Sequence, residues 1–241
     1  MIGLAGRTLD RYTLGQRVGK GGMADVYLGY DPHFRRAVAI KIFKQDNDGM
    51  LRRFMREAKL MANLHHPHLM PIYDTGECEI DGVTRYYIVM PFIDGGTLGM
   101  RIQHSILSPN EASSYLFDIA SSLDYLHKHG IIHRDIKSTN VLLSTDELCY
   151  LSDLGVARVL DDSMSLTTTG NVLGTVDYIA PELFVGTGKA DARSDIYSLG
   201  VLLFEMITGQ RPFAAENQVA LASMHVNQSP PLPSSLVPTI S

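Results

Sequence analysis

Two short segments of the sequence bring together side chains that suit the handling of a phosphoryl group. Residues 133–140 read HRDIKSTN, and Asp153-Leu154-Gly155 follows downstream. They supply two carboxylates, on Asp135 and Asp153, and the amide of Asn140. One carboxylate can orient an attacking hydroxyl, while the other, with the amide, can hold a metal that carries phosphates. These residue types therefore suit phosphoryl transfer from a magnesium nucleotide to a hydroxyl.

Both segments resemble the loops of the protein kinase catalytic domain, most of all the eukaryotic-like serine/threonine kinases of bacteria. The resemblance implies ATP as the phosphoryl donor. It implies that Asp135 orients a protein Ser/Thr hydroxyl and that Lys137 neutralises charge on the transferred group. Asn140 and Asp153 are then the ligands of Mg²⁺ (or Mn²⁺). Leu154 replaces the phenylalanine that usually follows the metal-binding aspartate, and it keeps the apolar character of that position.

A glycine-rich run, VGKGGMADV at residues 18–26, resembles the family's cover over the ATP phosphates. Glycine lets the backbone approach phosphate oxygens, although Ala24 stands where a third glycine is common. Taken alone, the run equally suits an ordinary hairpin turn. By resemblance, the ATP-binding positions are Val18, Gly19, Gly21, Gly22, Val26, Ala39, Lys41, Met90, Pro91, Ile93 and Leu142.

Lys41 stands in an apolar run, AVAIKIF, where an ammonium group needs an anionic partner if it is buried. The resemblance implies that it pairs with the nucleotide phosphates and with Glu57. Both residues therefore count among the expected catalytic residues. The alternatives are a solvated lysine on an edge strand and a Glu57 that pairs with Arg53 on its own helix.

Three further predictions concern positions around the catalytic loop. By resemblance, Thr167 and Thr169 are phosphorylation sites in an activation loop, and Arg134 binds the resulting phosphate. The alternative for the threonines is a polar loop. The segment from Ser194 to Gly200 resembles the family's buried anchoring helix, which implies that Asp195 holds backbone N–H groups near Arg134 and His133. The alternative is that Asp195 caps its own helix. His133 itself suits a packed structural residue better than a base.

Composition excludes several classes of protein. Hydrophobic residues make up 45% and charged residues 20%, which are globular values. The net charge of −5 gives no basic footprint for nucleic acid. The sequence has no apolar run long enough to cross a membrane, which takes about 18 residues. The two cysteines favour the reducing cytoplasm, and bacterial relatives often carry a membrane anchor after this domain.

Periodicity in the sequence predicts an α+β fold. Apolar and β-branched runs predict strands at Tyr12–Val18, Val26–Tyr30, Ala37–Phe43, Ile72–Asp74 and Arg85–Met90. Helical spacing predicts helices at Met50–Leu64, at about Pro109–Gly130 behind the capping box SPNE, and at about Ala192–Thr208. The last helix is apolar enough to be buried. The proline-rich tail from Ser229 predicts a connecting stretch.

By resemblance, a two-lobed kinase fold covers residues 12–241. The N-lobe, about 12–94, has an antiparallel sheet and one helix, and the C-lobe, about 95–241, is mainly helical. Residues 1–11 form a short N-terminal segment before this domain. In the family, the glutamate at the position of Glu182 pairs with an arginine near the end of the domain, but no Arg or Lys follows Arg211 here. By resemblance, we therefore expect the last two helices of the C-lobe to be missing and the chain to be less stable than a complete domain.

The expected activity is therefore that of a serine/threonine protein kinase that also phosphorylates its own loop, for which two kinase domains can pair. Its partners are protein substrates, without nucleic acid and without membrane contact in this stretch. Two rivals are a pseudokinase scaffold and a small-molecule phosphotransferase. The first rival is disfavoured because Lys41, Asp135 and Asp153 are all present. The Ala180-Pro181-Glu182 peptide-docking segment disfavours the second.

Overall fold

The computed structural model describes residues 4–22, 24–44, 55–56, 58–59, 61–153, 176–185 and 189–240. The chain divides into two compact units. The first contains Met1–His66 and Met70–Asp94, and the second contains Pro67–Leu69 and Gly95–Ser241. Each unit has its own sheet.

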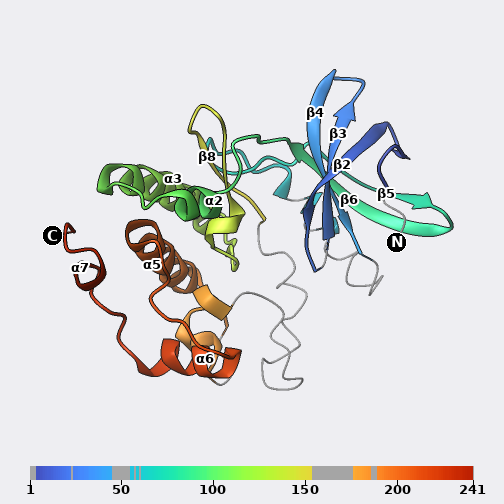
Figure 1. Ribbon diagram of the computed structural model, residues 1–241. Helices are drawn as coiled ribbons and strands as arrows, with labels where there is room; N and C mark the ends of the chain where they lie inside the picture. Colours follow the sequence, from blue (N-terminus) through green and yellow to red (C-terminus); the bar gives the residue numbers. More distant parts are fainter. Residues whose placement is uncertain are drawn as a thin grey trace. The chain divides into compact units, whose positions relative to one another are not determined.

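The first unit is built on a six-stranded antiparallel sheet (Figure 1). The strand order is β1-β2-β3-β4-β6-β5. The strands are β1 Thr8–Leu9, β2 Tyr12–Lys20, β3 Ala24–Asp31, β4 Arg36–Phe43, β5 Asp74–Ile80 and β6 Val83–Pro91. Four of the predicted strands are confirmed, since β2, β3, β4 and β6 cover the predicted spans and extend them at one or both ends.

Strand β5 lies later in the chain than we predicted. The sequence prediction of Ile72–Asp74 was wrong, because β5 begins at Asp74 and runs to Ile80. Its residues, DTGECEI, lack an apolar run, and only Ile80 is buried. An edge strand can be polar because most of its side chains face solvent, and β5 is the edge strand beside β6. The position of β5 is set by its backbone hydrogen bonds to β6, which cannot be predicted from a local sequence pattern.

The register of the strands decides which side chains share a face. In antiparallel strands, directly opposite residues point to the same face. Lys41 lies opposite Val26 on one side and Ile88 on the other, while Ala39 lies opposite Met90. Side chains alternate along a strand, so Ala39 and Lys41 also share a face. Four expected nucleotide-binding residues therefore lie on one face of the sheet.

The opposite face of the sheet packs into the core of the first unit. This buried cluster contains Leu9, Tyr12, Leu14, Tyr27, Val38, Ile40, Ile42, Ile80, Tyr87 and Val89. Burying a large apolar side chain stabilises the fold by roughly 1.5–3 kcal/mol. The cluster thus fixes the sheet and leaves its other face for the nucleotide-binding residues.

Part of the predicted helix Met50–Leu64 lies within the described residues. Residues 55, 56, 58, 59 and 61 are helical, and the helix ends at Met61, three residues before the predicted end. Met55 and Ala58 are buried, as the apolar spacing predicts. Glu57 lies outside the described residues.

The second unit is mainly helical. Its elements are α2 Leu98–His104, α3 Pro109–Lys128, η1 Ser138–Asn140, β7 Val141–Leu143, β8 Cys149–Leu151, η2 Val176–Tyr178, η3 Pro181–Leu183, α5 Ala192–Thr208, α6 Gln218–Asn227 and α7 Pro233–Leu236. Helix α3 packs against α5, and β7 pairs with β8 in a short hairpin (Figure 1).

Local signals set the ends of the two long helices, although the cap of α5 is Asp191, which we did not predict. Ser108 caps α3 and forms a reciprocal capping box with Glu111. Asp191 caps α5 through the Arg193 N–H at 2.8 Å. Gly209 ends α5 with a φ of 75°, a conformation that glycine adopts without strain. Because Asp191 is the cap, Asp195 is free of the capping role that we considered for it.

Helix α5 is largely buried, as its apolar sequence predicts. Leu199, Val201, Leu202, Phe204 and Met206 are all less than a tenth exposed. The tail beyond it differs from the prediction of a plain connecting stretch, because α7 forms a short helical turn that contacts α5. Among the described residues, no helix is both long and apolar enough to span a membrane.

Candidate active site

The carboxylate of Asp135 is held by two neighbours on its own loop. Lys137 donates from Nζ to Asp135 Oδ2 at 2.7 Å. Asn140 donates from Nδ2 both to that same oxygen and to the Asp135 backbone carbonyl, each at 2.8 Å. The Asp135 side chain remains 25% exposed. Lys137 and Asn140 therefore converge on one oxygen of a carboxylate that solvent can still reach.

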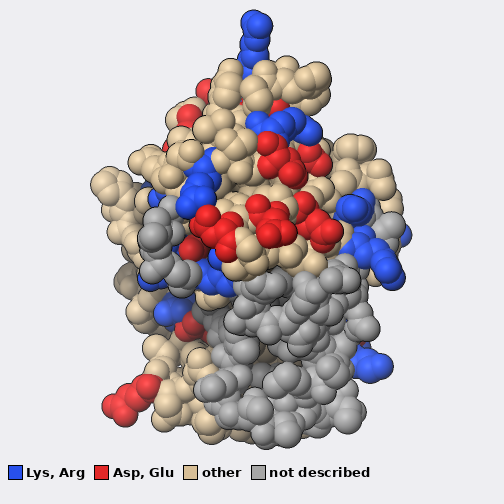
Figure 2. Space-filling view, turned by 90° about the vertical axis from the view of Figure 1, so that its right-hand side faces the viewer, with Lys and Arg blue, Asp and Glu red and all other residues tan. Residues whose placement is uncertain are grey.

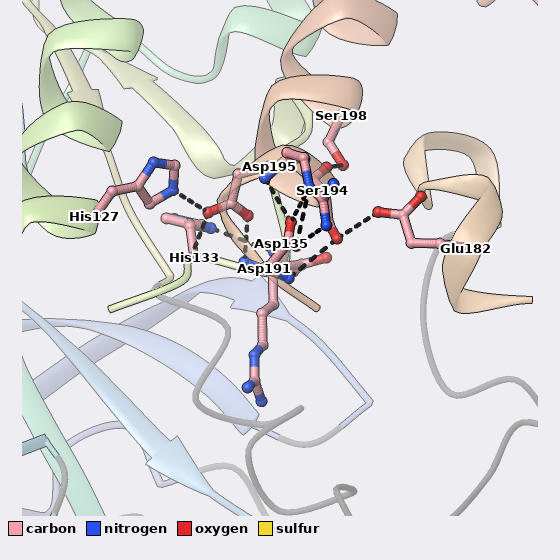
Figure 3. A network of polar contacts seen from close by, with 10 residues as sticks. His127, His133, Asp135, Glu182, Asp191, Ser194, Asp195 and Ser198 are labelled. Carbon is pink, nitrogen blue, oxygen red and sulfur yellow. Dashed lines mark hydrogen bonds and ion pairs between the residues drawn. The ribbon is translucent and has the colours of Figure 1, made fainter. Parts of the chain in front are cut away.

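Asp195 on α5 holds the backbone that leads into this loop (Figure 3). Its two carboxylate oxygens accept the N–H groups of His133 and Arg134, each at 2.8 Å. This confirms the prediction that Asp195 anchors these two residues. His127 on α3 adds a contact at 2.8 Å from Nε2 to Asp195 Oδ2. Asp195 is 1% exposed, so its charge relies on these donors.

His133 is a packed structural residue, as we predicted. It is fully buried, and burial lowers its pKa, against the opposing influence of Asp195 and Asp135. The Asp135 N–H donates to His133 Nδ1 at 3.3 Å. In the neutral ring the proton then sits on Nε2, which donates to the Ser152 carbonyl at 3.1 Å. His133 thus links the catalytic loop to the residue before Asp153.

Two residues of this region have an unusual backbone. Arg134 has a φ of 67° and Asp153 a φ of 58°, in the left-handed region that residues with a side chain seldom occupy. Such strained residues cluster at functional sites, where the surrounding contacts enforce them. Here the enforcing contacts are the Asp195 carboxylate for Arg134 and the bonds of Ser152 for Asp153.

Asn140 ties the catalytic loop to the segment that carries Asp153. Its carbonyl accepts the Ser152 N–H at 2.8 Å and the Ser152 hydroxyl at 2.9 Å. Its side-chain amide donates through Nδ2, which leaves the amide oxygen as the group with metal-binding chemistry. Amide and carboxylate oxygens are the ligands that Mg²⁺ prefers. The donor set of Asn140 and Asp153 therefore fits a hard divalent cation.

In the first unit, two glycines at the junction of β2 and β3 have little room for a side chain. A Cβ on Gly21 would lie 2.9 Å from the Ala24 carbonyl oxygen, and one on Gly19 would lie 3.3 Å from Val26 Cβ. The Gly21 N–H donates to the Ala24 carbonyl at 2.9 Å, which closes the turn. The backbone is thus exposed where the sequence predicted contact with phosphates.

The remaining predicted positions divide between the two units. Met90 and Pro91 end β6, with Ile93 just after it, and Val18 lies near the end of β2. Leu142 lies on β7 in the second unit, opposite Tyr150. Three predicted residues lie outside the described residues, namely Glu57, Thr167 and Thr169.

Sequence reasoning missed two contacts that fix the segment after residue 175. Ser194 donates to Glu182 Oε1 at 2.6 Å, so a hydroxyl on α5 contacts the glutamate for which we found no cationic partner (Figure 3). Tyr178 donates to Glu205 Oε2 at 2.5 Å and lies 3.1 Å from Ser138 Oγ. Burial raises the pKa of Tyr178 above its usual value. For the contact between Ser194 and Glu182, the only signal in the sequence was the position of Ser194 beside Asp195. The contact between Tyr178 and Glu205 had no signal in the sequence.

Comparison with known proteins places the chain among bacterial kinases. Residues 12–236 match the family model described as "Protein kinase domain". The probable serine/threonine-protein kinase SCO3848 of Streptomyces coelicolor is 42% identical over 96% of this chain and 35% of its own length. The serine/threonine-protein kinase PknB of Mycobacterium leprae is 41% identical over 93% of this chain and 37% of its own.

A solved structure agrees with the sequence relatives. The kinase domain of PknI from Mycobacterium tuberculosis matches with a TM-score of 0.74 and 28% identity, over 98% of this chain and 86% of that chain. The predicted α+β kinase fold is thereby confirmed. The chain spans about a third of the length of the two curated relatives. With nearly all of its residues matched, the chain belongs to the protein kinase domain family.

Proposed function

We propose that this chain transfers the γ-phosphoryl group of ATP to serine and threonine hydroxyls of proteins. The observation that carries the proposal is the Asp135 carboxylate, which Lys137 and Asn140 hold through one oxygen while it stays open to solvent. A carboxylate placed in this way can accept a hydrogen bond from an incoming hydroxyl. Phosphoryl transfer asks the protein chiefly for positioning and charge stabilisation.

Each residue of the catalytic loop has a separate task in this proposal. Asp135 orients the acceptor hydroxyl and takes its proton as the bond to phosphorus forms. Lys137, 2.7 Å from that carboxylate, also neutralises charge on the transferred group. Asn140 and Asp153 hold Mg²⁺, or Mn²⁺, which when bound neutralises the phosphate oxygens. Arg134 and His133 take no chemical part; the former binds a regulatory phosphate.

In the first unit, we propose that the sheet face with Lys41 binds ATP. Val26, Ala39 and Met90 on this face contact the adenine, and Lys41 pairs with phosphates and with Glu57. The backbone at Val18, Gly19, Gly21 and Gly22 covers the phosphates. The Pro91 carbonyl and the Ile93 N–H bind the adenine edge, since proline lacks an N–H but keeps its carbonyl. Leu142, in the second unit, is a further proposed adenine-binding residue. The two units then act as N-lobe and C-lobe.

A protein rather than a small molecule is the proposed acceptor. Support comes from the docking segment around η3, where α5 fixes Glu182 through Ser194 and the Tyr178 carbonyl through Ser198 at 2.7 Å. A small-molecule phosphotransferase has no use for such a segment. A pseudokinase is disfavoured because the loop around Asp135 is intact in geometry as well as in sequence.

Regulation by phosphorylation is also part of the proposal. Thr167 and Thr169 accept the γ-phosphoryl group of ATP in a reaction that a second copy of the domain catalyses, and Arg134 binds the resulting phosphothreonine. If transfer occurs between copies, the initial rate of autophosphorylation rises with the square of protein concentration. A rate linear in concentration indicates transfer within one copy instead. Phosphopeptide mapping decides between these threonines and other sites.

We propose a cytoplasmic location, which the free thiols of Cys78 and Cys149 support. Protein substrates are the proposed partners. Figure 2 shows Asp and Glu side chains gathered on one face of the molecule with Lys and Arg side chains around them, so this face offers nucleic acid no continuous basic surface. In the first unit, Arg7 pairs with Asp81 at 2.8 Å and Arg11 pairs with Asp74 at 2.9 Å. These carboxylates neutralise the positive charge of both arginines.

Radiolabelled ATP tests the proposed function directly. We expect label on serine or threonine of a generic protein substrate, in the presence of Mg²⁺, and none on tyrosine. A panel of sugars, choline and aminoglycosides serves as the small-molecule acceptor control. Label on these acceptors alone contradicts the proposed substrate class. Nucleotide binding without any transfer favours the pseudokinase.

A further inference from the structure

Lys44 connects the end of β4 to the tip of the glycine-rich turn. It follows directly after the last residue of β4. Its Nζ donates to the Gly21 carbonyl at 2.5 Å and lies 3.0 Å from Asp25 Oδ1. The backbone carbonyl of Gly21 is therefore held by an ammonium group that comes from a different strand.

Asp25 keeps the Lys44 ammonium in this place. The Asp25 side chain is 18% exposed and also faces Arg17 Nη1 at 3.5 Å. Burial alone raises the pKa of Asp25, but hydrogen bonding and charge from Lys44, and then from Arg17, bring it below its usual value. Asp25 is thus ionised at neutral pH. The ion pair limits Lys44 Nζ to the neighbourhood of the Gly21 carbonyl.

The contact fixes the orientation of one peptide group. In a trans peptide the carbonyl and the following N–H point in opposite directions, and the described residues contain no cis peptide. With the Gly21 carbonyl turned toward Lys44, the Gly22 N–H points away from Lys44. The Gly21 N–H is engaged by the Ala24 carbonyl at 2.9 Å. Gly22 is therefore the glycine of this turn whose N–H orientation Lys44 controls.

Among the described residues, Lys44 is the group that holds the Gly21 carbonyl, so without this contact the peptide group is loosely held. Consecutive glycines accept a wide range of backbone angles because neither carries a Cβ. A rotation of the Gly21–Gly22 peptide would exchange an N–H for a carbonyl oxygen. An N–H attracts a phosphate oxygen, and a carbonyl repels it. The hydrogen bond from Lys44 thus favours the orientation in which this peptide group presents an N–H on the side away from Lys44.

We propose that Lys44 is a positioning residue for the ATP phosphates, acting through the Gly21 carbonyl to keep the Gly22 N–H available as a donor. The inference rests on the proposed function, because it requires that ATP binds at this turn. Lys44 differs from Lys41 in mechanism, since it acts on the protein backbone and needs no contact with the nucleotide. Its effect therefore depends on the phosphates and not on the base.

Calorimetric titration with MgATP and with adenosine separates these contributions. In Lys44→Met, we expect the affinity for MgATP to fall about tenfold, the equivalent of roughly one charge-assisted hydrogen bond. We expect the affinity for adenosine, which has no phosphate, to stay within twofold of the original protein. In steady-state assays the KM for ATP rises, while kcat and the KM for the protein substrate stay unchanged.

Three further variants complete the design. Lys44→Arg keeps a cationic donor and restores most of the MgATP affinity. Asp25→Asn removes the charge that keeps the Lys44 ammonium in place, so its loss of MgATP affinity is smaller than that of Lys44→Met. Arg17→Gln removes the other cation from Asp25 without touching Gly21, so its affinity for MgATP stays unchanged. If Lys44→Met fails to give a cooperative thermal melt, Lys44→Gln, which keeps a neutral donor but loses the charge, takes its place with a smaller expected loss.

The outcomes distinguish the inference from the proposed function. Unchanged MgATP affinity in Lys44→Met overturns the inference while the function stands. Equal losses for MgATP and adenosine also overturn it, because they indicate a general distortion of the first unit. If the original protein binds no MgATP, the proposed function and the inference both fail. Loss confined to the phosphate-bearing ligand supports the inference.

Discussion

Asp135 is prepared for its proposed task by contacts within its own loop. Lys137 and Asn140 both donate to Oδ2, so the carboxylate is oriented by the protein itself. Groups that are already oriented need no reorganisation during reaction, which is how enzymes gain most of their electrostatic stabilisation. Buried His133 fixes the start of the loop, because its neutral ring donates from Nε2 to the Ser152 carbonyl.

His133 makes stability depend on pH in a predictable direction. Its folded-state pKa lies below the ordinary value of 6.5, so the unfolded chain binds more protons as the pH falls below 6.5. The contribution of neutral His133 to the free energy of unfolding is fully present above this pH and is lost as the pH falls toward the folded-state pKa. We therefore expect His133→Asn to destabilise the protein more at about pH 7.5 than at about pH 5.5.

Urea denaturation at the two pH values measures this difference. Burial also lowers the pKa of His225, but His225 is present in both proteins and cancels in the comparison. A destabilisation by His133→Asn that is the same at both pH values would show that His133 is not held in its neutral form.

Helix α5 supplies the fixed points for two separate segments. Asp195 holds the start of the catalytic loop, while Ser194 and Ser198 hold the segment around η3 (Figure 3). Ser194 and Ser198 lie one turn apart and therefore share a side of the helix. A buried helix can position both segments because its own place is set by apolar packing along Leu199 to Met206.

Replacing Asp195 with Asn tests the anchor of the catalytic loop. An amide has one acceptor oxygen, so the N–H of His133 or of Arg134 loses its bond. Leaving a buried donor unsatisfied costs about 1–3 kcal/mol. We expect Asp195→Asn to lower the free energy of unfolding by this amount and to reduce kcat.

Asp124→Asn is the matched control for this change. Asp124 is exposed on α3 and pairs with Lys128 at 2.6 Å, a contact worth about 0.3–0.5 kcal/mol. Equal effects of the two substitutions would contradict an anchoring role for Asp195. Chemical denaturation of both variants supplies the comparison.

Ser194→Ala tests the contact to the docking segment. It removes the 2.6 Å bond to Glu182 and half of the capping box at the start of α5, so we expect a loss of about 1 kcal/mol. The KM for a protein substrate rises, while the KM for ATP is unchanged. Ser114→Ala, on an exposed position of α3, controls for helix propensity. An unchanged KM for the protein substrate would mean that Glu182 is positioned by other contacts.

The helices and most strands follow from local sequence. The capping box at Ser108 and the glycine stop at Gly209 each act within a few residues, so both could be predicted. The Asp191 cap is equally local, but we considered Asp195 for that role instead. Strand β5 was misplaced because its position depends on pairing with β6, a tertiary interaction. The bonds from Ser194 to Glu182 and from Tyr178 to Glu205 join distant residues, and an isolated sequence gives them no signature. The loop chemistry around Asp135 was predictable because its members lie within eight residues of one another.

The chain as a whole combines a β-rich unit with a helical one, and the proposed activity draws residues from both. Lys41 and the glycine-rich turn belong to the first unit, and Asp135, Asn140 and Asp153 belong to the second. A ligand that binds only the folded protein stabilises it by RT ln(1 + [L]/Kd), about 2.7 kcal/mol at a hundredfold excess over Kd.

We therefore expect MgATP to raise the melting temperature of the chain. ATP with a chelator should raise it less, because Asn140 and Asp153 then lack the cation for which their oxygen atoms are suited. Differential scanning calorimetry measures both shifts. Equal shifts with and without divalent metal would contradict the assignment of these two residues as metal ligands.

The central claim is that Asp135 orients the acceptor hydroxyl and takes its proton. Asp135→Asn keeps the shape of the side chain and removes its basicity. We expect kcat for protein phosphorylation to fall by about 10²–10⁴-fold, with the affinity for MgATP within twofold of the original protein. Phosphoryl transfer by Asp135→Asn at the original rate, measured with radiolabelled ATP under saturating substrate, would contradict the claim outright.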